Sequence, residues 1–232
     1  MPLVLQMPDR GVATQTLEPE EVDAAAPERS GYLGGITLGA PLWRGQWGLS
    51  RNLTREASDE WRAFFARLRR SGRGFFAWDR ERPFPKAHRQ GFERMTTAGG
   101  APFTGSASGW SQTIDSDGNA MLELTGLPSG LSLGLGDYIG FRWDASGSAA
   151  GTHDRRTMVR CVGTATANAS GVALVMVEPA VPVLVVPSGA QAHLDRPGCI
   201  MRLVPGESAL APMDNRTKIG GGTINAVQDL RA

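Results

Sequence analysis

Residues 58–70 read SDEWRAFFARLRR, and this stretch decides more of the fold than any other. Its four large apolar side chains recur at positions i, i+3, i+4 and i+7, on one helical face: Trp61, Phe64, Phe65 and Leu68. Ser58 is a good N-cap residue, and the two carboxylates after it suit the positive end of the helix dipole. Gly72 or Gly74 can end the helix in a left-handed cap. The stretch therefore predicts an amphipathic helix from about residue 58 to residue 70.

Aromatic strands are predicted on both sides of this helix. After it, residues 75–78 (FFAW) form a short apolar run, which we expect to pack against the helix. Before it, residues 31–53 read as strand material interrupted by glycines. Trp43 and Trp47 are an even number of residues apart, so they share one face of a regular strand, and Leu49 joins them.

Charge is distributed unevenly, although the formal net charge of the 232-residue chain is only +1. The first thirty residues are acidic and include Glu18, Glu20 and Glu21. Residues 51–94 carry twelve Lys and Arg against six Asp and Glu, and their polar end, residues 79–94, is predicted to be a loop. We expect the acidic segment to be either a flexible arm or an edge strand paired with a neighbouring subunit. The sequence leaves both interpretations open.

From Thr96 onward the composition shifts to Gly, Ala, Ser and Thr, with few charges. Short strands are expected at residues 121–124, 138–143, 157–163, 172–177 and 181–186. Turn residues separate them at 115–118 and at 168–171, where a hairpin is predicted between the strands at 157 and 172. This spacing favours a small barrel or sandwich. A last strand at 199–204 precedes a polar tail, in which Gly220–Gly222 is interpreted as a hinge.

Residues that carry chemistry do not form a recognisable catalytic or metal motif. The histidines, His88, His153 and His193, lack metal-ligand spacing, and no serine lies in a Gly-x-Ser-x-Gly elbow. A calcium loop starting at Asp115 lacks the required glycine and glutamate at its sixth and twelfth positions. The glycines of residues 134–140 precede a strand instead of a helix, unlike a dinucleotide fingerprint. We therefore expect no enzyme activity, no cofactor and no metal.

Composition and the length of apolar runs argue against several further classes of protein. A nearly neutral chain gives no electrostatic case for a membrane or nucleic-acid partner. No apolar run approaches the roughly 20 residues that span a bilayer, and the first residues do not resemble a signal peptide. Two cysteines, Cys161 and Cys199, are too few for a disulfide scaffold, so we expect both to be small core residues.

The order of these parts also resembles a known family. Residues 43–47 (WRGQW) precede the helix, and residues 74–79 (GFFAWD) follow it directly. Further strands follow at residues 135–139 (LGDYI), 158–162 (MVRCV), 171–179 (GVALVMVEP) and 199–203 (CIMRL). This succession resembles the distal tail proteins and related tail-tip subunits of long-tailed phages and prophage-like particles.

The resemblance implies a mainly β protein: a tail-tube-like β-sandwich with one amphipathic helix, plus an inserted small β-barrel or sandwich. The ring-forming core domain would comprise residues 1–94 and 196–232, and the insertion residues 95–195. By the same resemblance, the chain is made in the host cytoplasm. It then forms a ring in the virion, commonly hexameric, which joins the tail tube protein to the hub or tip proteins of the baseplate.

A ring requires head-to-tail contacts between two different surfaces. Our hypothesis is that the acidic residues of one subunit approach the basic residues of the next: Glu18, Glu20 and Glu21 against Arg69, Arg70 and Arg73. Solvated charged faces are the alternative. A carbohydrate-binding module that contacts the host surface is the rival function, with Trp110 and Trp143 as the candidate sugar platforms unless both are core residues. A cell-wall hydrolase is a weaker rival, because no pair of carboxylates is associated with an aromatic cleft.

Overall fold

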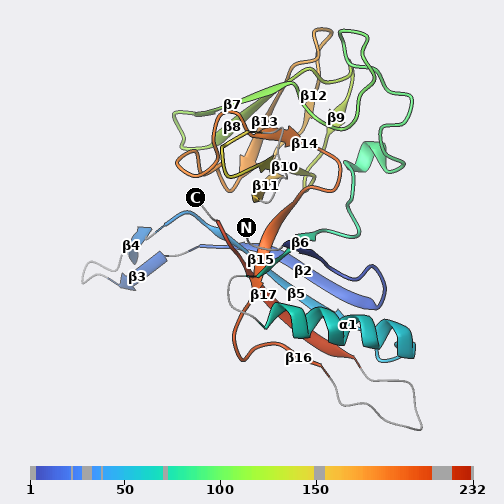
Figure 1. Ribbon diagram of the computed structural model, residues 1–232. Coiled ribbons are helices and arrows are strands. Elements are labelled where there is room, and N and C mark those ends of the chain that lie inside the picture. The colour runs from blue at the N-terminus through green and yellow to red at the C-terminus, as the bar shows by residue number, and fades with distance from the viewer. Residues whose placement is uncertain are drawn as a thin grey trace. The chain divides into compact units, whose positions relative to one another are not determined.

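The computed structural model describes residues 4–21, 23–27, 33–37, 39–69, 73–148, 155–210 and 221–230. It confirms the mainly β class, with one α-helix and several sheets among these residues (Figure 1). The chain divides into two compact units. Unit 1 comprises Met1–Phe75 and Met201–Asp229, and unit 2 comprises Phe76–Ile200 with Leu230–Ala232.

The main sheet of unit 1 is assembled from both ends of the chain. Its strand order is β1-β6-β15-β17-β5-β2, and the short β16 (Ala209–Leu210) pairs with β17. The bounds are Val4–Gln6 for β1, Val12–Glu20 for β2, Leu42–Leu49 for β5, Gly74–Trp78 for β6, Gly198–Leu203 for β15 and Gly222–Gln228 for β17. Two of these strands, β6 and β15, run from one unit into the other.

The core of unit 1 lies between this sheet and helix α1 (Arg55–Leu68). Burial along β5 alternates, so that Trp43, Trp47 and Leu49 are all buried, as their spacing predicted. The Phe75 ring contacts both Trp47 and the helical Phe64 edge-on, at centroid distances of 5.8 and 5.4 Å. The predicted packing of the helix on the following strand is therefore confirmed.

The helix begins one turn earlier than predicted. Thr54 is the N-cap, because its backbone is extended and its side-chain oxygen accepts a hydrogen bond from the Ala57 amide at 3.2 Å. The prediction of Ser58 as the cap was wrong: Ser58 lies inside the helix and is buried. Ala57 extends the apolar stripe toward the N-terminus, so burial on the helix starts at Ala57, two residues after the helix begins at Arg55. Gly74 begins β6 and does not cap the helix.

The polar C-terminal segment supplies a central strand, where the sequence had suggested a tail with a glycine hinge. Strand β17 pairs with β15 on one side and with β5 on the other. Its buried residues alternate: Ile224, Ala226 and Gln228. The Gln228 side chain accepts a hydrogen bond from the Trp43 amide at 3.1 Å, so this buried polar group is satisfied.

The acidic N-terminal segment pairs within its own chain. Strand β2 lies antiparallel to β5 over its full length, with one register shift between Val12 and Thr14. A separate antiparallel pair follows, β3 (Asp23–Pro27) with β4 (Leu33–Thr37). The alternative of a flexible arm therefore fails for residues 12–20, and β2 lies at one end of the strand order.

Unit 2 is built on a six-stranded sheet with the order β14-β10-β11-β13-β8-β7. Its strands are β7 (Gly109–Ile114), β8 (Ala120–Thr125), β10 (Tyr138–Trp143), β11 (Arg155–Cys161), β13 (Ala173–Glu178) and β14 (Gln191–His193). The short β9 (Ser132–Leu133) and β12 (Ala165–Thr166) form a second pair. Both cysteines are buried, as predicted.

One predicted strand of unit 2 is absent and one hairpin is rearranged. Residues 181–186 form turns, in which the Val185 and Val186 amides donate to the Pro182 carbonyl, so the strand prediction there was wrong. Nearby prolines remove the amide donors that a sheet ladder needs. The predicted partners β11 and β13 do pair antiparallel, but the turn at Asn168 connects the short β12 to β13, because β12 lies between the two strands of the hairpin.

Residues 76–94 belong to unit 2, whereas the sequence assigned them to the first domain. Phe84 and Phe92 pack with the core of unit 2, and the Arg156 guanidinium lies 4.3 Å above the Phe76 ring. A 3-10 turn, η1 (Lys86–His88), lies in this segment, and the His88 ring accepts a hydrogen bond from the Ser132 amide at 3.3 Å.

Candidate functional site

The charged residues proposed for subunit contacts all belong to unit 1. Glu18, Glu20 and Glu21 are exposed at the end of β2, and Arg69 is exposed where α1 ends. Arg73 donates to the Arg67 carbonyl at 3.1 Å and so is tied to the last helical turn. Arg70 lies outside the described residues.

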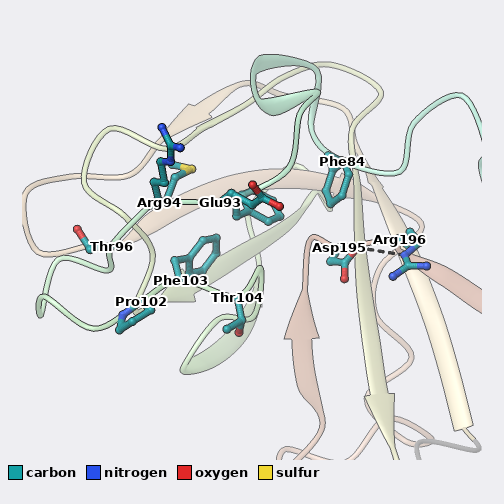
Figure 2. Close-up of a pocket in the computed structure, with 11 residues that line it drawn as sticks. Phe84, Glu93, Arg94, Thr96, Pro102, Phe103, Thr104, Asp195 and Arg196 are labelled. Carbon is teal, nitrogen blue, oxygen red and sulfur yellow. Dashed lines mark hydrogen bonds and ion pairs between the residues drawn. The ribbon is translucent and has the colours of Figure 1, made fainter.

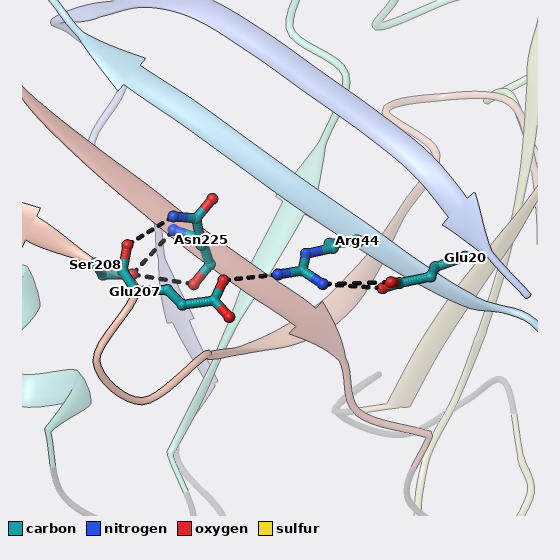
Figure 3. Close-up of polar contacts among 5 residues, drawn as sticks. All are labelled: Glu20, Arg44, Glu207, Ser208 and Asn225. Carbon is teal, nitrogen blue, oxygen red and sulfur yellow. Dashed lines mark hydrogen bonds and ion pairs between the residues drawn. The ribbon is translucent and has the colours of Figure 1, made fainter. Parts of the chain in front are cut away.

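Glu20 has a partner within its own chain (Figure 3). The Arg44 guanidinium on β5 donates to Glu20 at 3.2 Å and to Glu207 at 2.7 Å. These two carboxylates raise the pKa of Arg44 above its usual value, Glu20 contributing first. Asn225 of β17 fixes the Glu207 segment, because its side chain donates to the Glu207 carbonyl at 2.6 Å. The bridge therefore links β2, β5 and the turn after β15.

Both tryptophans proposed as sugar platforms pack with the core of unit 2: one belongs to the core, and the other lies against it. Trp143 is 2% exposed and belongs to the core, because β10 is covered on both faces, so this position offers no platform. Trp110 is half-buried: its indole N–H donates to the Ala190 carbonyl at 2.8 Å, and its ring contacts Phe141 at 4.8 Å. Sequence reasoning placed Trp143 in a strand but not Trp110, which lies in β7, and it could not tell which faces were covered.

Unit 2 has two adjoining hollows that the sequence did not reveal. We call the first the aromatic groove; it has a volume of about 470 Å³. Its walls are Phe84, Phe92, Glu93, Arg94, Met95, Thr96, Pro102, Phe103, Thr104, Asp195 and Arg196. Figure 2 shows the Phe84 and Phe103 rings on opposite sides, with charged and hydroxyl groups around them. Phe92 contacts both rings edge-on, at 5.6 Å from Phe84 and 5.0 Å from Phe103.

Backbone contacts hold the aromatic groove together. The Phe103 amide donates to the Met95 carbonyl at 2.9 Å, and the Arg196 amide donates to the Pro83 carbonyl at 2.7 Å. Gly105 has a φ of +86°, and a Cβ there would lie 2.9 Å from the Phe92 ring and 3.1 Å from Asp195. Only glycine fits this position without strain, because both the dihedral angle and the close approach exclude a side chain.

We call the second hollow the basic pocket; it has a volume of about 510 Å³. Its walls are Arg80, Glu81, Arg82, Pro83, Phe84, Lys86 and Arg89, so Phe84 is common to both hollows. The Arg82 guanidinium donates to the Gly136 carbonyl, and the Lys86 ammonium to the Leu135 carbonyl, each at 2.7 Å. The signal in the sequence was the pair of phenylalanines within an otherwise polar, basic loop.

The buried titratable groups of unit 2 have structural roles. The Asp137 carboxylate is 1% exposed and accepts from the amides of Gly134 at 2.7 Å and Lys86 at 3.0 Å. Burial, with a smaller contribution from Asp137, raises the pKa of the Cys161 thiol to about 12. The His193 ring contacts the Asp195 carbonyl at 2.9 Å. These contacts fix loops and strand ends.

In the described part of the chain, no three His, Cys, Asp or Glu side chains gather in a way that could hold a metal ion. No helix there has both the length and the hydropathy needed to cross a bilayer. A scan against models of protein families gives no match, and a search of curated proteins finds no similar sequence.

Proposed function

We propose that the chain is a structural subunit of a ring at the distal end of a phage tail, where the ring joins the tail tube to the tip or baseplate. The observation that carries this proposal is the order of parts along the chain. Strands from both ends form one sheet covered by an amphipathic helix, and a mainly β unit is inserted between β6 and β15. The resemblance to distal tail proteins implies this same order.

The ends of the unit 1 sheet support a head-to-tail contact. The strand order runs from β1, with three residues, to β2, with nine. The two ends therefore differ in length and sequence, and contacts between unlike surfaces generate rings when the rotation closes. Terminal strands also present unpaired backbone N–H and C=O groups, so they need to be covered or protected against unwanted pairing.

The distribution of charge gives a second, more specific argument for a head-to-tail contact. Glu18 is exposed on β2, and Arg69 is exposed at the end of α1, so one subunit presents both signs. We test Glu18 against a neighbour's Arg69, because Glu18 lies on β2 at one end of the strand order. In the assembled particle, the ring's partners would be further copies of itself, the tail tube protein and the hub or tip proteins.

The first experiment measures the oligomeric state of the purified full chain by light scattering and negative-stain imaging. The proposal predicts closed rings, hexameric by the resemblance, with a central hole. A monomer across the whole accessible concentration range contradicts it.

Charge reversal then tests the contact itself. Glu18→Arg and Arg69→Glu are each expected to weaken assembly, and the double variant is expected to restore it, because the pair is re-formed with opposite polarity. Glu123→Arg is the matched control, since this residue is exposed on β8 of unit 2 and gives the same change in charge. Failure of the double variant to recover assembly counts against this pairing.

A further inference from the structure

The basic pocket concentrates positive charge without an equal number of carboxylates. Arg80, Arg82, Lys86 and Arg89 line it together with a single acidic residue, Glu81. Among the described residues, no carboxylate lies at ion-pair distance from Arg82, Lys86 or Arg89. A hollow of net positive charge favours an anion, because its low-dielectric walls focus the field.

Two of these cations are held in place before any ligand arrives. The carbonyls of Gly136 and Leu135 orient Arg82 and Lys86 but carry no net charge to neutralise them. The buried Asp137 offsets one positive charge from the inner side of the same loop, where it accepts from the Lys86 amide. A surplus of positive charge therefore remains in the basic pocket. Side chains that are already ordered also lose less entropy when they bind a ligand.

The adjoining aromatic groove, unlike the basic pocket, has no surplus of positive charge among its lining residues. Its rim carries hydroxyls and both signs of charge: Glu93, Arg94, Thr96, Thr104, Asp195 and Arg196. Asp195 and Arg196 form an ion pair at 3.3 Å, so this part of the rim is nearly neutral (Figure 2). Carboxylates and hydroxyls are hydrogen-bond acceptors for hydroxyl groups, and Phe84 forms an apolar wall next to the cations.

We propose that these two hollows together bind an acidic oligosaccharide. The negatively charged group of one sugar residue lies in the basic pocket, and the next sugar packs against Phe84 with its hydroxyls donating to Glu93 and Asp195. This inference concerns unit 2 and is independent of ring assembly. It also differs from the tryptophan platforms considered above, because none of its residues is Trp110 or Trp143.

A single-stranded nucleic acid suits the same surface less well. Such ligands stack successive bases on exposed aromatic faces. Here Phe92 is only 7% exposed and Phe103 only 5%. The phosphates also offer no hydrogen-bond donor to the carboxylates of Glu93 and Asp195, whereas sugar hydroxyls can donate to them.

Binding is measured by calorimetry on the full chain, with tetragalacturonate as the acidic probe and maltotetraose as the neutral one. We expect tetragalacturonate to bind at low ionic strength and more weakly at about 0.15 M salt, because salt screens exposed charges. Maltotetraose should not bind measurably.

Replacements of Arg89 test the site, because this side chain is exposed and its loss leaves the backbone contacts of Arg82 and Lys86 intact. Arg89→Gln should weaken tetragalacturonate binding about tenfold, since one charge-assisted contact is lost, and Arg89→Glu should weaken it further. Arg51→Glu is the matched control, because it makes the same charge change at an exposed position of unit 1 and should leave affinity unchanged.

Four results would overturn the proposal. Arg89→Glu could bind tetragalacturonate like the unaltered chain, or Arg51→Glu could lose as much affinity as Arg89→Glu. The neutral tetrasaccharide could bind as well as the acidic one. An oligothymidylate of similar charge could bind more tightly than tetragalacturonate, which would assign the surface to nucleic acid.

Discussion

Gly105 and Gly118 share a φ of +86°, but their surroundings differ. A Cβ on Gly105 would meet the Phe92 ring at 2.9 Å, whereas one on Gly118 would meet nothing within 4 Å. Gly118→Ala should therefore lower the free energy of unfolding by about 1 kcal/mol, from backbone strain alone. Gly105→Ala should lower it by about 3 kcal/mol, because overpacking against the aromatic groove is added.

Urea unfolding of both variants measures the difference. Equal losses in the two variants would mean that the Phe92 ring and Asp195 move aside at little cost, and that the aromatic groove is not rigid at this point.

The buried thiol of Cys161 predicts a pH dependence of stability. Its pKa is raised to about 12 in the folded chain, against about 8.5 for a free cysteine. Between pH 9 and pH 11 the unfolded thiol loses its proton while the folded one keeps it, so stability falls as pH rises. We expect Cys161→Ala to make this fall shallower, by at most about 1.4 kcal/mol per pH unit.

The measurement is urea unfolding at pH 8, 9 and 10 for the unaltered chain and for Cys161→Ala. The slope is compared, since the absolute stability also changes when the thiol is removed from the core. Parallel curves would contradict the prediction.

At the scale of elements, helix α1 allows a test with two similar residues. Thr54 caps the helix, so Thr54→Ala should cost about 1 kcal/mol of stability. Ser58 lies inside the helix, where alanine has the better propensity, so Ser58→Ala should be neutral or slightly stabilising. Thermal unfolding of both variants checks this, and the reverse order of effects would restore Ser58 as the cap.

Local patterns were sufficient to predict some elements, while others depend on distant parts of the chain. The stripe of α1 and the alternating tryptophans of β5 are visible within a few residues, and both were confirmed. Strand β17 is not visible in its local sequence, which is polar and rich in glycine. It is ordered by its partners on both sides, β15 and β5. Whether Trp143 is a core residue or a sugar platform was undecided for the same reason, since strand alternation does not reveal when both faces are covered.

For the whole molecule, the boundary between the units makes a prediction about fragments. A fragment of residues 76–200 should fold on its own and unfold cooperatively, because the core of unit 2 lies within it. A fragment of residues 95–195, the boundary expected from the sequence, lacks Phe84 and Phe92 and should be less stable by several kcal/mol. Near-ultraviolet circular dichroism and urea unfolding compare the two fragments.

Equal stability of the two fragments would show that residues 76–94 contribute little to unit 2. Sequence reasoning placed this segment with the first domain because its basic charge continued that of the helix. The contacts that bind it to unit 2, such as the Lys86 amide to Asp137 at 3.0 Å, join residues fifty-one positions apart. No local pattern predicts such a pairing.

The chain leaves unit 1 along β6 and returns along β15, and these two strands are neighbours in one sheet. A foreign module whose own ends lie side by side can therefore be spliced in at this pair of strands, with the hydrogen-bonded order around it retained. Recombination between genes of such chains needs only two crossover points to exchange unit 2. Unit 2 can therefore diversify while the sheet of unit 1 stays the same.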